Sequence, residues 1–270
     1  KFDKVAELVG DGIRGPKVNR ELSTSKILTM EFIEGYNLTQ IIGFIKNNDT
    51  KKLKQIEFNG KEVTLKLIRN ILETSHVHGF FHADPHPANI INTLNGELVF
   101  IDFGIVGSLS KKDRILMLRY FRELLVGKAD ESLDSLLKLC GEPALTNIEE
   151  IRNKYRILIK KFMDTIESKT YLEQQIKSGP ILAETVNLLQ NNGVRMPVSI
   201  VRYFKSFETV EGLIFALYPE LQIKDMVKEF RRVSIINIVD AIPTAISEKN
   251  LNNIVLSVID SLEKNLVLND

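Results

Sequence analysis

The feature that most constrains the fold is a short β-hairpin pattern between residues 89 and 102. Ile90–Thr93 and Leu98–Ile101 are two runs rich in apolar and β-branched residues, and Asn95-Gly96 lies between them. An Asn-Gly pair in this context is typical of a tight hairpin turn, because both residues tolerate positive φ. A hairpin returns the chain to its starting point. Asn89, before the first strand, and Asp102, after the second, are therefore predicted to lie close together.

The polar residues around this hairpin suit phosphate chemistry that depends on a divalent cation. Asn89 and Asp102 offer oxygen atoms of the kind that Mg²⁺ prefers. Asp84, five positions before Asn89, offers a carboxylate that could accept a proton from, or orient, an attacking hydroxyl or water. We identify Asp84 as the candidate catalytic residue. Asn89 and Asp102 are the candidate metal ligands and would contact the nucleotide phosphates through the metal.

The spacing of these residues matches the catalytic machinery of protein-kinase-like enzymes. His82-Ala-Asp84 followed by Asn89 has the order H-x-D-x-x-x-x-N, and Asp102-Phe-Gly104 follows it. Each piece alone is weak, because Asp-Pro is common in turns, asparagine is common in caps, and tripeptides recur by chance. The two motifs in this order, joined by a hairpin, form a specific combination.

The same residues carry a resemblance to a known family. The string Gly-Phe-Phe-His-Ala-Asp-Pro-His-Pro-Ala-Asn at 79–89, followed by the Asp-Phe-Gly at 102–104, resembles the signature of the ABC1/UbiB/ADCK family of atypical kinases. Residues 15–35 resemble the stretch that leads to that family's hinge. Ala88 stands where the family usually has glycine, which removes backbone freedom before Asn89 but removes no ligand.

The resemblance implies an Mg-ATP-dependent kinase or ATPase, with ATP and Mg²⁺ as cofactors. The backbone at Glu31, Phe32 and Ile33 would contact adenine in the hinge. The reaction would support isoprenoid-quinone or related lipid metabolism, with membrane lipid or quinone-biosynthesis proteins as partners. The implied location is a membrane of a bacterium, archaeon, mitochondrion or plastid. Two alternatives remain: a small-molecule phosphotransferase of the aminoglycoside or choline kinase type, and a pseudokinase scaffold, which the intact acidic residues disfavour.

We expect an α+β fold, mainly α, that corresponds to a protein-kinase-like C-lobe with a catalytic-loop hairpin. Residues 1–35 would hold the last N-lobe strands and the hinge, and residues 36–270 the helical C-lobe with a C-terminal helical extension. The phosphate-binding lysine, the Ala-rich nucleotide loop and the Lys-x-Gly-Gln motif of the family do not precede the hinge. We therefore expect a piece of a longer protein that is catalytically incomplete alone.

Hydrophobic spacing and turn residues predict the remaining elements. Two strands, 17–20 and 27–33, flank a turn at 22–25, and a polar surface loop follows at 47–52. Ser110 and Asp113 form a capping box for a helix that Gly127 closes. The predicted helices span 38–45, 63–78, 111–126, 130–139, 148–168, 181–191, 197–217, 223–247 with a break at Pro243, and 250–267.

A zinc-hydrolase site is the competing hypothesis for the histidine-rich stretch. Five potential ligands lie within eleven residues: His76, His78, His82, Asp84 and His86. The H-x-H-x-D-H register of metallo-β-lactamases fails, because phenylalanines stand where Asp and His are required, and no Cys pair exists. We therefore predict that His76 and His78 are structural and that His82 is structural or orienting.

Composition excludes several other classes. A net charge of +1 without a basic block argues against nucleic-acid binding. The single cysteine, Cys140, excludes an internal disulfide framework and is predicted to be a small core residue. No apolar run approaches the roughly 18 residues of a membrane span. The G-x-G-x-x-G match at 10–15 is not expected to bind phosphate, because Pro16 follows where a helix should begin.

Overall fold

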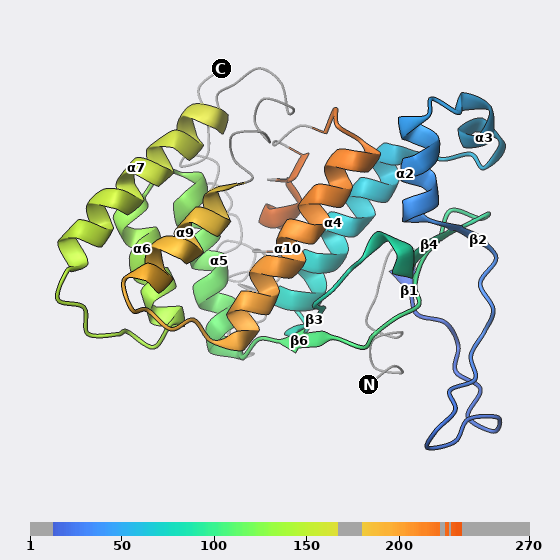
Figure 1. The fold of residues 1–270 in the computed structure, drawn as a ribbon, viewed down its shortest axis with the longest axis horizontal. Coiled ribbons are helices and arrows are strands. Elements are labelled where there is room, and N and C mark those ends of the chain that lie inside the picture. Colours follow the sequence, from blue (N-terminus) through green and yellow to red (C-terminus); the bar gives the residue numbers. More distant parts are fainter. Residues whose placement is uncertain (1–12, 167–179, 222–224, 227, 234–270) are drawn as a thin grey trace, which may run out of the picture. The chain divides into compact units, whose positions relative to one another are not determined.

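The structure is a computed structural model that describes residues 13–166, 180–221, 225–226 and 228–233 (Figure 1). Within them the fold is mainly helical α+β with two small sheets, as expected. Gly10 and Gly12 of the glycine motif, Pro243 and the predicted helix 250–267 lie outside the described residues. The predicted helix 223–247 is described only at 225–226 and 228–233, where the backbone is helical.

The described chain divides into two compact units. The first contains residues 13–109 and 198–226, and the second contains residues 110–197 and 228–233 where these are described. The chain therefore leaves the first unit after Leu109 and re-enters it at Val198. This division matters for function, because all of the predicted site residues belong to the first unit.

The first unit contains a four-stranded sheet built around the predicted hairpin. Its strands are β1 (Ile13–Arg14), β5 (Leu98–Phe100), β4 (Ile90–Thr93) and β2 (Gly35–Asn37), in that order across the sheet. β4 and β5 are antiparallel and pair Ile91 with Val99, which confirms the hairpin. β1 runs parallel to β5, an arrangement that the short motif did not predict.

A second, two-stranded sheet lies before and after this hairpin in the chain. β3 (Phe80–His82) pairs antiparallel with β6 (Val106–Ser108), and Phe81 stands opposite Gly107. Phe81 is fully buried. A Cβ atom on Gly107 would overlap the Phe81 ring, so the close approach of these strands depends on glycine at this position.

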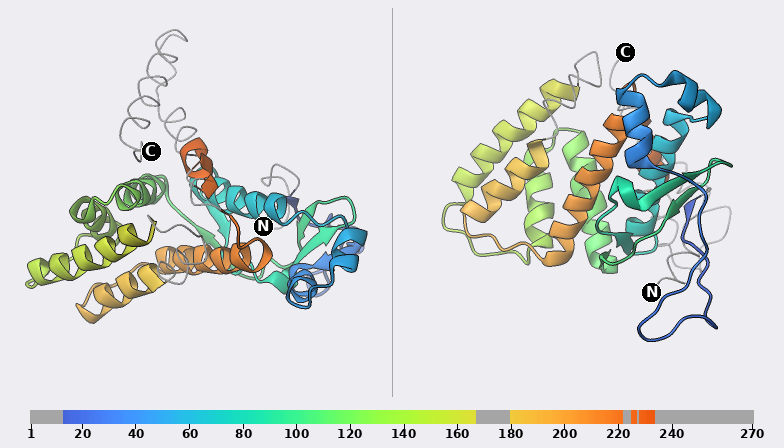
Figure 2. Two further views of the ribbon diagram at one scale, coloured as in Figure 1. Left: turned by 90° about the horizontal axis from the view of Figure 1, so that it is seen from above. Right: turned by 45° about the vertical axis from the view of Figure 1, so that its right-hand side comes forward.

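Helices α4 (Gly60–His76) and α10 (Val198–Leu217) lie side by side in the first unit (Figures 1 and 2). The apolar spacing predicted for α4 is confirmed by five buried residues: Val63, Leu67, Ile68, Ile71 and Leu72. This helix starts three residues earlier than predicted, because Asn59 caps it, and it ends at His76, two residues before its predicted end. α2 (Leu38–Lys46) matches its predicted helix.

The N-terminal segment and one loop differ from prediction. Residues 17–33 form a hairpin with a single bridge, Val18 to Met30, instead of two regular strands. The Ser23 hydroxyl accepts the Thr29 N–H, and the Thr24 hydroxyl accepts the Ile27 N–H. These side-chain bonds take backbone donors that longer strands would use to pair with each other. The predicted loop at 47–52 is also wrong in part, because Asp49 caps a short helix, α3 (Thr50–Gln55).

The second unit is helical in its described part. Its helices are α5 (Lys111–Leu125), α6 (Ala129–Leu139), α7 (Ile148–Ile166) and α9 (Pro180–Asn191). The Ser110–Asp113 capping box is confirmed, and Gly127, with a φ of 72°, follows the end of α5. Cys140 is half-buried at the end of α6, and burial raises the pKa of its thiol to about 11. Its burial is only partial, which falls short of the core position that its sequence context predicts.

Candidate functional site

The structure brings Asn89 and Asp102 together at the open end of the β4–β5 hairpin. The Asn89 Nδ2 atom donates to the Asp102 Oδ2 atom over 3.2 Å. The main chains are joined as well, because the Ile101 N–H donates to the Asn89 carbonyl over 2.9 Å. The proximity predicted from the hairpin is thus confirmed, whereas the roles of the two residues remain predictions.

The Asp102 side chain is exposed and held in a fixed direction. The Gly104 N–H donates to the Asp102 Oδ1 atom over 2.7 Å, so the Asp-Phe-Gly turn folds back on its own carboxylate. The side chain as a whole remains exposed, although its Oδ2 atom accepts the Asn89 amide. One carboxylate and one amide oxygen at such a point fit the donor set of Mg²⁺, which takes few protein ligands and completes its shell with phosphates and water.

His82 connects the segment of Asp84 to that of Asp102. Its Nδ1 atom accepts the Asp84 N–H over 3.1 Å, and its Nε2 atom hydrogen-bonds to the Asp102 main-chain carbonyl. Because an N–H group can only donate, Nδ1 carries no hydrogen and Nε2 is the donor. Burial lowers the pKa of His82, which favours this neutral form. Its ring also lies 5.4 Å from the rings of Phe100 and Phe103.

Asp84 begins a compact turn that leads to Asn89. The His86 N–H donates to the Asp84 carbonyl over 2.7 Å, and the His86 Nδ1 atom accepts the Ala88 N–H at the start of a 3-10 turn, η1 (Pro87–Asn89). The Asp84 carboxylate is half-buried. Ala88 does not have a positive φ, so alanine fits at this position. Among the described non-glycine residues, positive φ occurs at Asn48, Glu57 and Glu142.

The three predicted hinge residues have different environments. Phe32 is 86% exposed, whereas Ile33 is buried. The Glu31 carboxylate hydrogen-bonds to the Arg14 guanidinium over 2.8 Å, and this contact lowers the pKa of Glu31. The Glu31 N–H donates to the Lys17 carbonyl within the N-terminal hairpin. The Glu31 N–H is therefore already paired, and the adenine contacts expected of these three residues stay a prediction.

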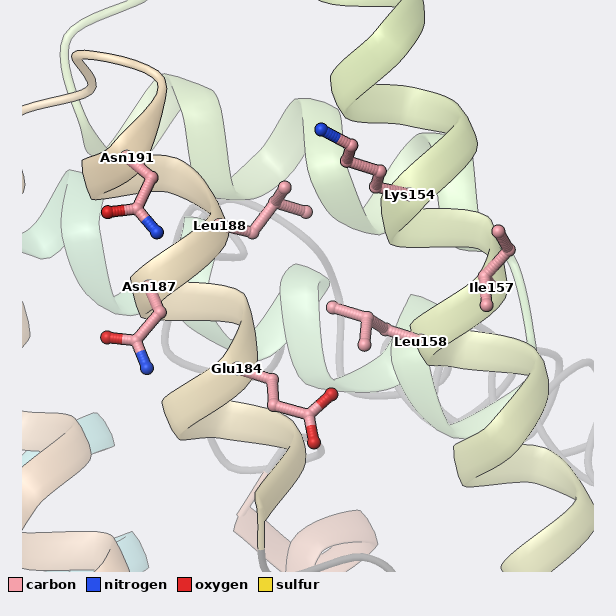
Figure 3. A pocket seen from close by; sticks show the side chains of 7 residues that line it. All are labelled: Lys154, Ile157, Leu158, Glu184, Asn187, Leu188 and Asn191. Atoms are coloured by element: carbon pink, nitrogen blue, oxygen red, sulfur yellow. The ribbon is translucent and has the colours of Figure 1, made fainter.

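Two open cavities among the described residues have linings that do not include Asp84, Asn89 or Asp102. One, of about 260 Å³, lies between the segment 31–34 and the hairpin turn 93–97. The other, of about 380 Å³, lies between α7 and α9 in the second unit (Figure 3). Its floor is aliphatic, from Leu158 and Leu188, and its rim carries Lys154 and Glu184. In this structure the Asp102 side chain is exposed and Asn89 is half-buried.

The histidines are engaged in different parts of the first unit. His76 is fully buried on α4, and its Nε2 atom lies 2.8 Å from the hydroxyl of Tyr203, which confirms its structural role. His78 is exposed. Across the described ranges, no three His, Cys, Asp or Glu side chains converge as a metal-binding group. The zinc hypothesis therefore gains no support from this geometry.

The sequence did not predict three residues that contact strand β3, which leads into the catalytic loop. Gly107 admits the Phe81 ring, Tyr203 contacts that ring at 5.5 Å, and Ser206 donates to the His82 carbonyl. The last two lie on α10, more than 100 residues after the catalytic loop. No local pattern could have identified them, because their partners are set by the packing of α10 and not by spacing in the sequence.

Comparison with known proteins places these motifs in one family. Residues 3–135 match the sequence model described as "ABC1 atypical kinase-like domain". This range contains the predicted hinge, Asp84, Asn89 and Asp102. It ends before α7, α9 and α10, so the match covers only part of the first unit.

The chain is also similar to curated proteins from bacteria and plants. It is 29% identical over 273 residues to the "Probable protein kinase UbiB" of Aliivibrio fischeri, covering 94% of this chain and 46% of that protein. It is 26% identical over 208 residues to "Protein ACTIVITY OF BC1 COMPLEX KINASE 7, chloroplastic" of Arabidopsis thaliana, covering 77% of this chain and 28% of that protein. An uncharacterised Clostridium pasteurianum protein is 29% identical over 230 residues, covering 84% of this chain and 39% of its own length.

The chain spans less than half the length of each of these relatives. The word "chloroplastic" in one name applies to that plant protein. Among the described helices of this chain, none combines the length and the apolar character that crossing a bilayer requires.

Proposed function

Because this chain belongs to the ABC1 atypical kinase-like family, we propose that it supplies the metal- and base-bearing part of an Mg-ATP-dependent kinase or ATPase site. The observation that carries the proposal is the pairing of Asn89 with Asp102 at the open end of the hairpin, joined to Asp84 through His82. In this arrangement an amide and an acid meet at the end of the hairpin, and the backbone of a second acid, Asp84, is tied to them through His82.

The roles follow from the chemistry of each side chain. Asp102 and Asn89 would hold Mg²⁺, which when bound neutralises charge on the nucleotide phosphates. Asp102 is suited to this role because its side chain is exposed, while the Gly104 N–H and the Asn89 Nδ2 atom fix the direction of its two oxygens. Asp84 would orient the attacking hydroxyl or water and accept its proton. The backbone of Glu31, Phe32 and Ile33 would contact adenine.

The acceptor of the phosphoryl group is part of the same proposal. The family resemblance favours a reaction that supports isoprenoid-quinone or related lipid metabolism at a membrane. A small-molecule phosphotransferase of the aminoglycoside or choline kinase type would use the same acidic residues with another acceptor. A pseudokinase scaffold would bind nucleotide without turnover, so measured turnover separates it from both enzymes.

The test is Mg-dependent ATP binding by the full-length protein and its Asp102→Asn variant, measured by isothermal titration calorimetry. Loss of a carboxylate ligand should weaken Mg-ATP binding by at least tenfold, on the order of the loss seen when metal sites are disturbed. Asp164→Asn is the matched control, because it removes the same charge from an exposed position on α7. Equal Mg-dependent affinity in wild type and Asp102→Asn would refute the metal assignment.

A further inference from the structure

Ser206 on α10 reaches the catalytic loop from a distant part of the sequence. Its Oγ atom donates to the main-chain carbonyl of His82 over 2.6 Å, across 124 residues. Ser206 is fully buried, whereas His82 is half-buried. We propose that Ser206 is a positioning residue, which sets the backbone of the loop that carries Asp84; the catalytic part of this inference rests on the function proposed above.

The pairing of β3 explains why the His82 carbonyl needs a partner outside its sheet. The Leu109 N–H donates to the Gly79 carbonyl, and the Ala83 N–H donates to the Ile105 carbonyl. Hydrogen-bonded and non-hydrogen-bonded positions alternate along an antiparallel pair of strands. Because Gly79 and Ala83 are hydrogen-bonded positions, His82 is a non-hydrogen-bonded one. The backbone of His82 therefore faces away from β6, and its carbonyl is directed to α10 instead.

Tyr203 gives α10 a second contact with the same strand. It precedes Ser206 by three residues, so the two side chains lie on the same face of the helix. The Tyr203 ring meets the Phe81 ring edge-on, with centroids 5.5 Å apart. Its hydroxyl lies 2.8 Å from the His76 Nε2 atom on α4. α10 is thereby fixed to α4 while it holds both Phe81 and His82.

Ser206 would act on the site through His82. The two ring nitrogens of His82 bind the Asp84 N–H and the Asp102 carbonyl, so a shift of the His82 backbone moves both segments. Small displacements of positioned groups are costly, since about 1 Å can reduce turnover by roughly a hundredfold. The residue lies outside the 3–135 range of the family match, so the family motifs do not identify it.

The test compares three variants on α10 in the full-length protein. Ser206→Ala removes the hydroxyl that binds His82, and Ser206→Thr retains a hydroxyl. Thr209→Ala is the matched control, because the Thr209 hydroxyl bonds only to the Lys205 carbonyl of its own helix among the described contacts. Backbone hydrogen exchange of residues 80–86 is the primary measurement, and it needs no nucleotide.

We expect exchange in residues 80–86 to be about fivefold faster in Ser206→Ala, as the loss of one hydrogen bond predicts. Ser206→Thr should restore slow exchange, and Thr209→Ala should match wild type. Exchange in α6 should stay unchanged, which separates a local effect from general unfolding. Unchanged exchange at 80–86, or equal acceleration in α6, would overturn the positioning role.

Turnover and binding then test the catalytic part. In Ser206→Ala, kcat should fall about tenfold, whereas the Kd for Mg-ATP should stay within about twofold because Asn89 and Asp102 are intact. A wild-type kcat in a variant with faster loop exchange would show that Ser206 does not position the site. Absence of Mg-ATP binding in wild type would refute the proposed function and the catalytic part together, while the exchange result would still decide whether Ser206 orders the loop.

Discussion

His82 donates the hydrogen of its Nε2 atom to the main-chain carbonyl of Asp102, 20 residues further along the chain. The bond uses the backbone of Asp102, so it fixes the position of this residue without occupying its carboxylate. The other ring nitrogen accepts the Asp84 N–H. A neutral imidazole therefore sets the separation of two acidic residues and adds no charge between them.

Replacing Asp84 should separate binding from turnover. In Asp84→Asn the side chain keeps its size but can no longer accept a proton, so kcat should fall by about a hundredfold or more. The Kd for Mg-ATP should change little, because Asn89 and Asp102 are untouched. Single-turnover kinetics with calorimetry would check both values. Turnover at the wild-type rate would show that Asp84 is not the base.

Protein purified without a chelator should contain no stoichiometric zinc. Both ring nitrogens of His82 and the Nδ1 atom of His86 already take part in hydrogen bonds within the loop. Elemental analysis by mass spectrometry would measure the metal content. One zinc ion per chain, lost when His82 and His86 are both replaced, would instead favour a metallohydrolase.

Gly107→Ala should destabilise the first unit, because the new methyl group would overlap the buried Phe81 ring. Overpacking of this kind costs about 1–3 kcal/mol of unfolding free energy. Gly43→Ala in α2 is the matched control, since no atom lies within 4 Å of its new Cβ and alanine favours helix by up to about 1 kcal/mol. Denaturant unfolding would measure both, and equal stabilities would contradict the packing of β3 against β6.

The Arg14–Glu31 pair should make stability sensitive to mild acid. The Arg14 hydrogen bond lowers the pKa of Glu31 below its ordinary value of 4.5. A lowered folded-state pKa means that the stabilisation is complete above the ordinary value and is lost as pH falls through the folded value. Wild type should therefore lose about 0.5–1 kcal/mol relative to Glu31→Gln between roughly pH 5 and pH 3. If the unfolding free energies of wild type and Glu31→Gln changed equally with pH, the Arg14–Glu31 pair would not contribute to acid sensitivity.

The local features of the site were readable from the sequence. Asn95-Gly96 between two apolar runs predicted the hairpin, and the hairpin predicted that Asn89 and Asp102 meet. Both follow from rules that act within about a dozen residues. The capping residues Ser110 and Asp113 likewise marked the start of α5 correctly, because their hydrogen bonds are local.

Most of the features that were missed depend on distant partners. β1, β3 and β6 are two or three residues long, too short to show an alternating pattern. The link from Ser206 to His82 depends on how α10 packs, which spacing along the chain does not record. α3 was missed for a different reason, since a single aspartate cap outweighed a polar composition that is typical of loops.

The return of the chain to the first unit at Val198 has a consequence for synthesis on the ribosome. Ser206 emerges 124 residues after His82. Synthesis proceeds at about 5–20 residues per second, so roughly 6–25 s would pass between the synthesis of the catalytic loop and that of α10, which contacts it. During that interval Phe81 lacks the aromatic partner that covers it in the folded protein. The second unit would be largely made, and free to fold, before the first unit is complete.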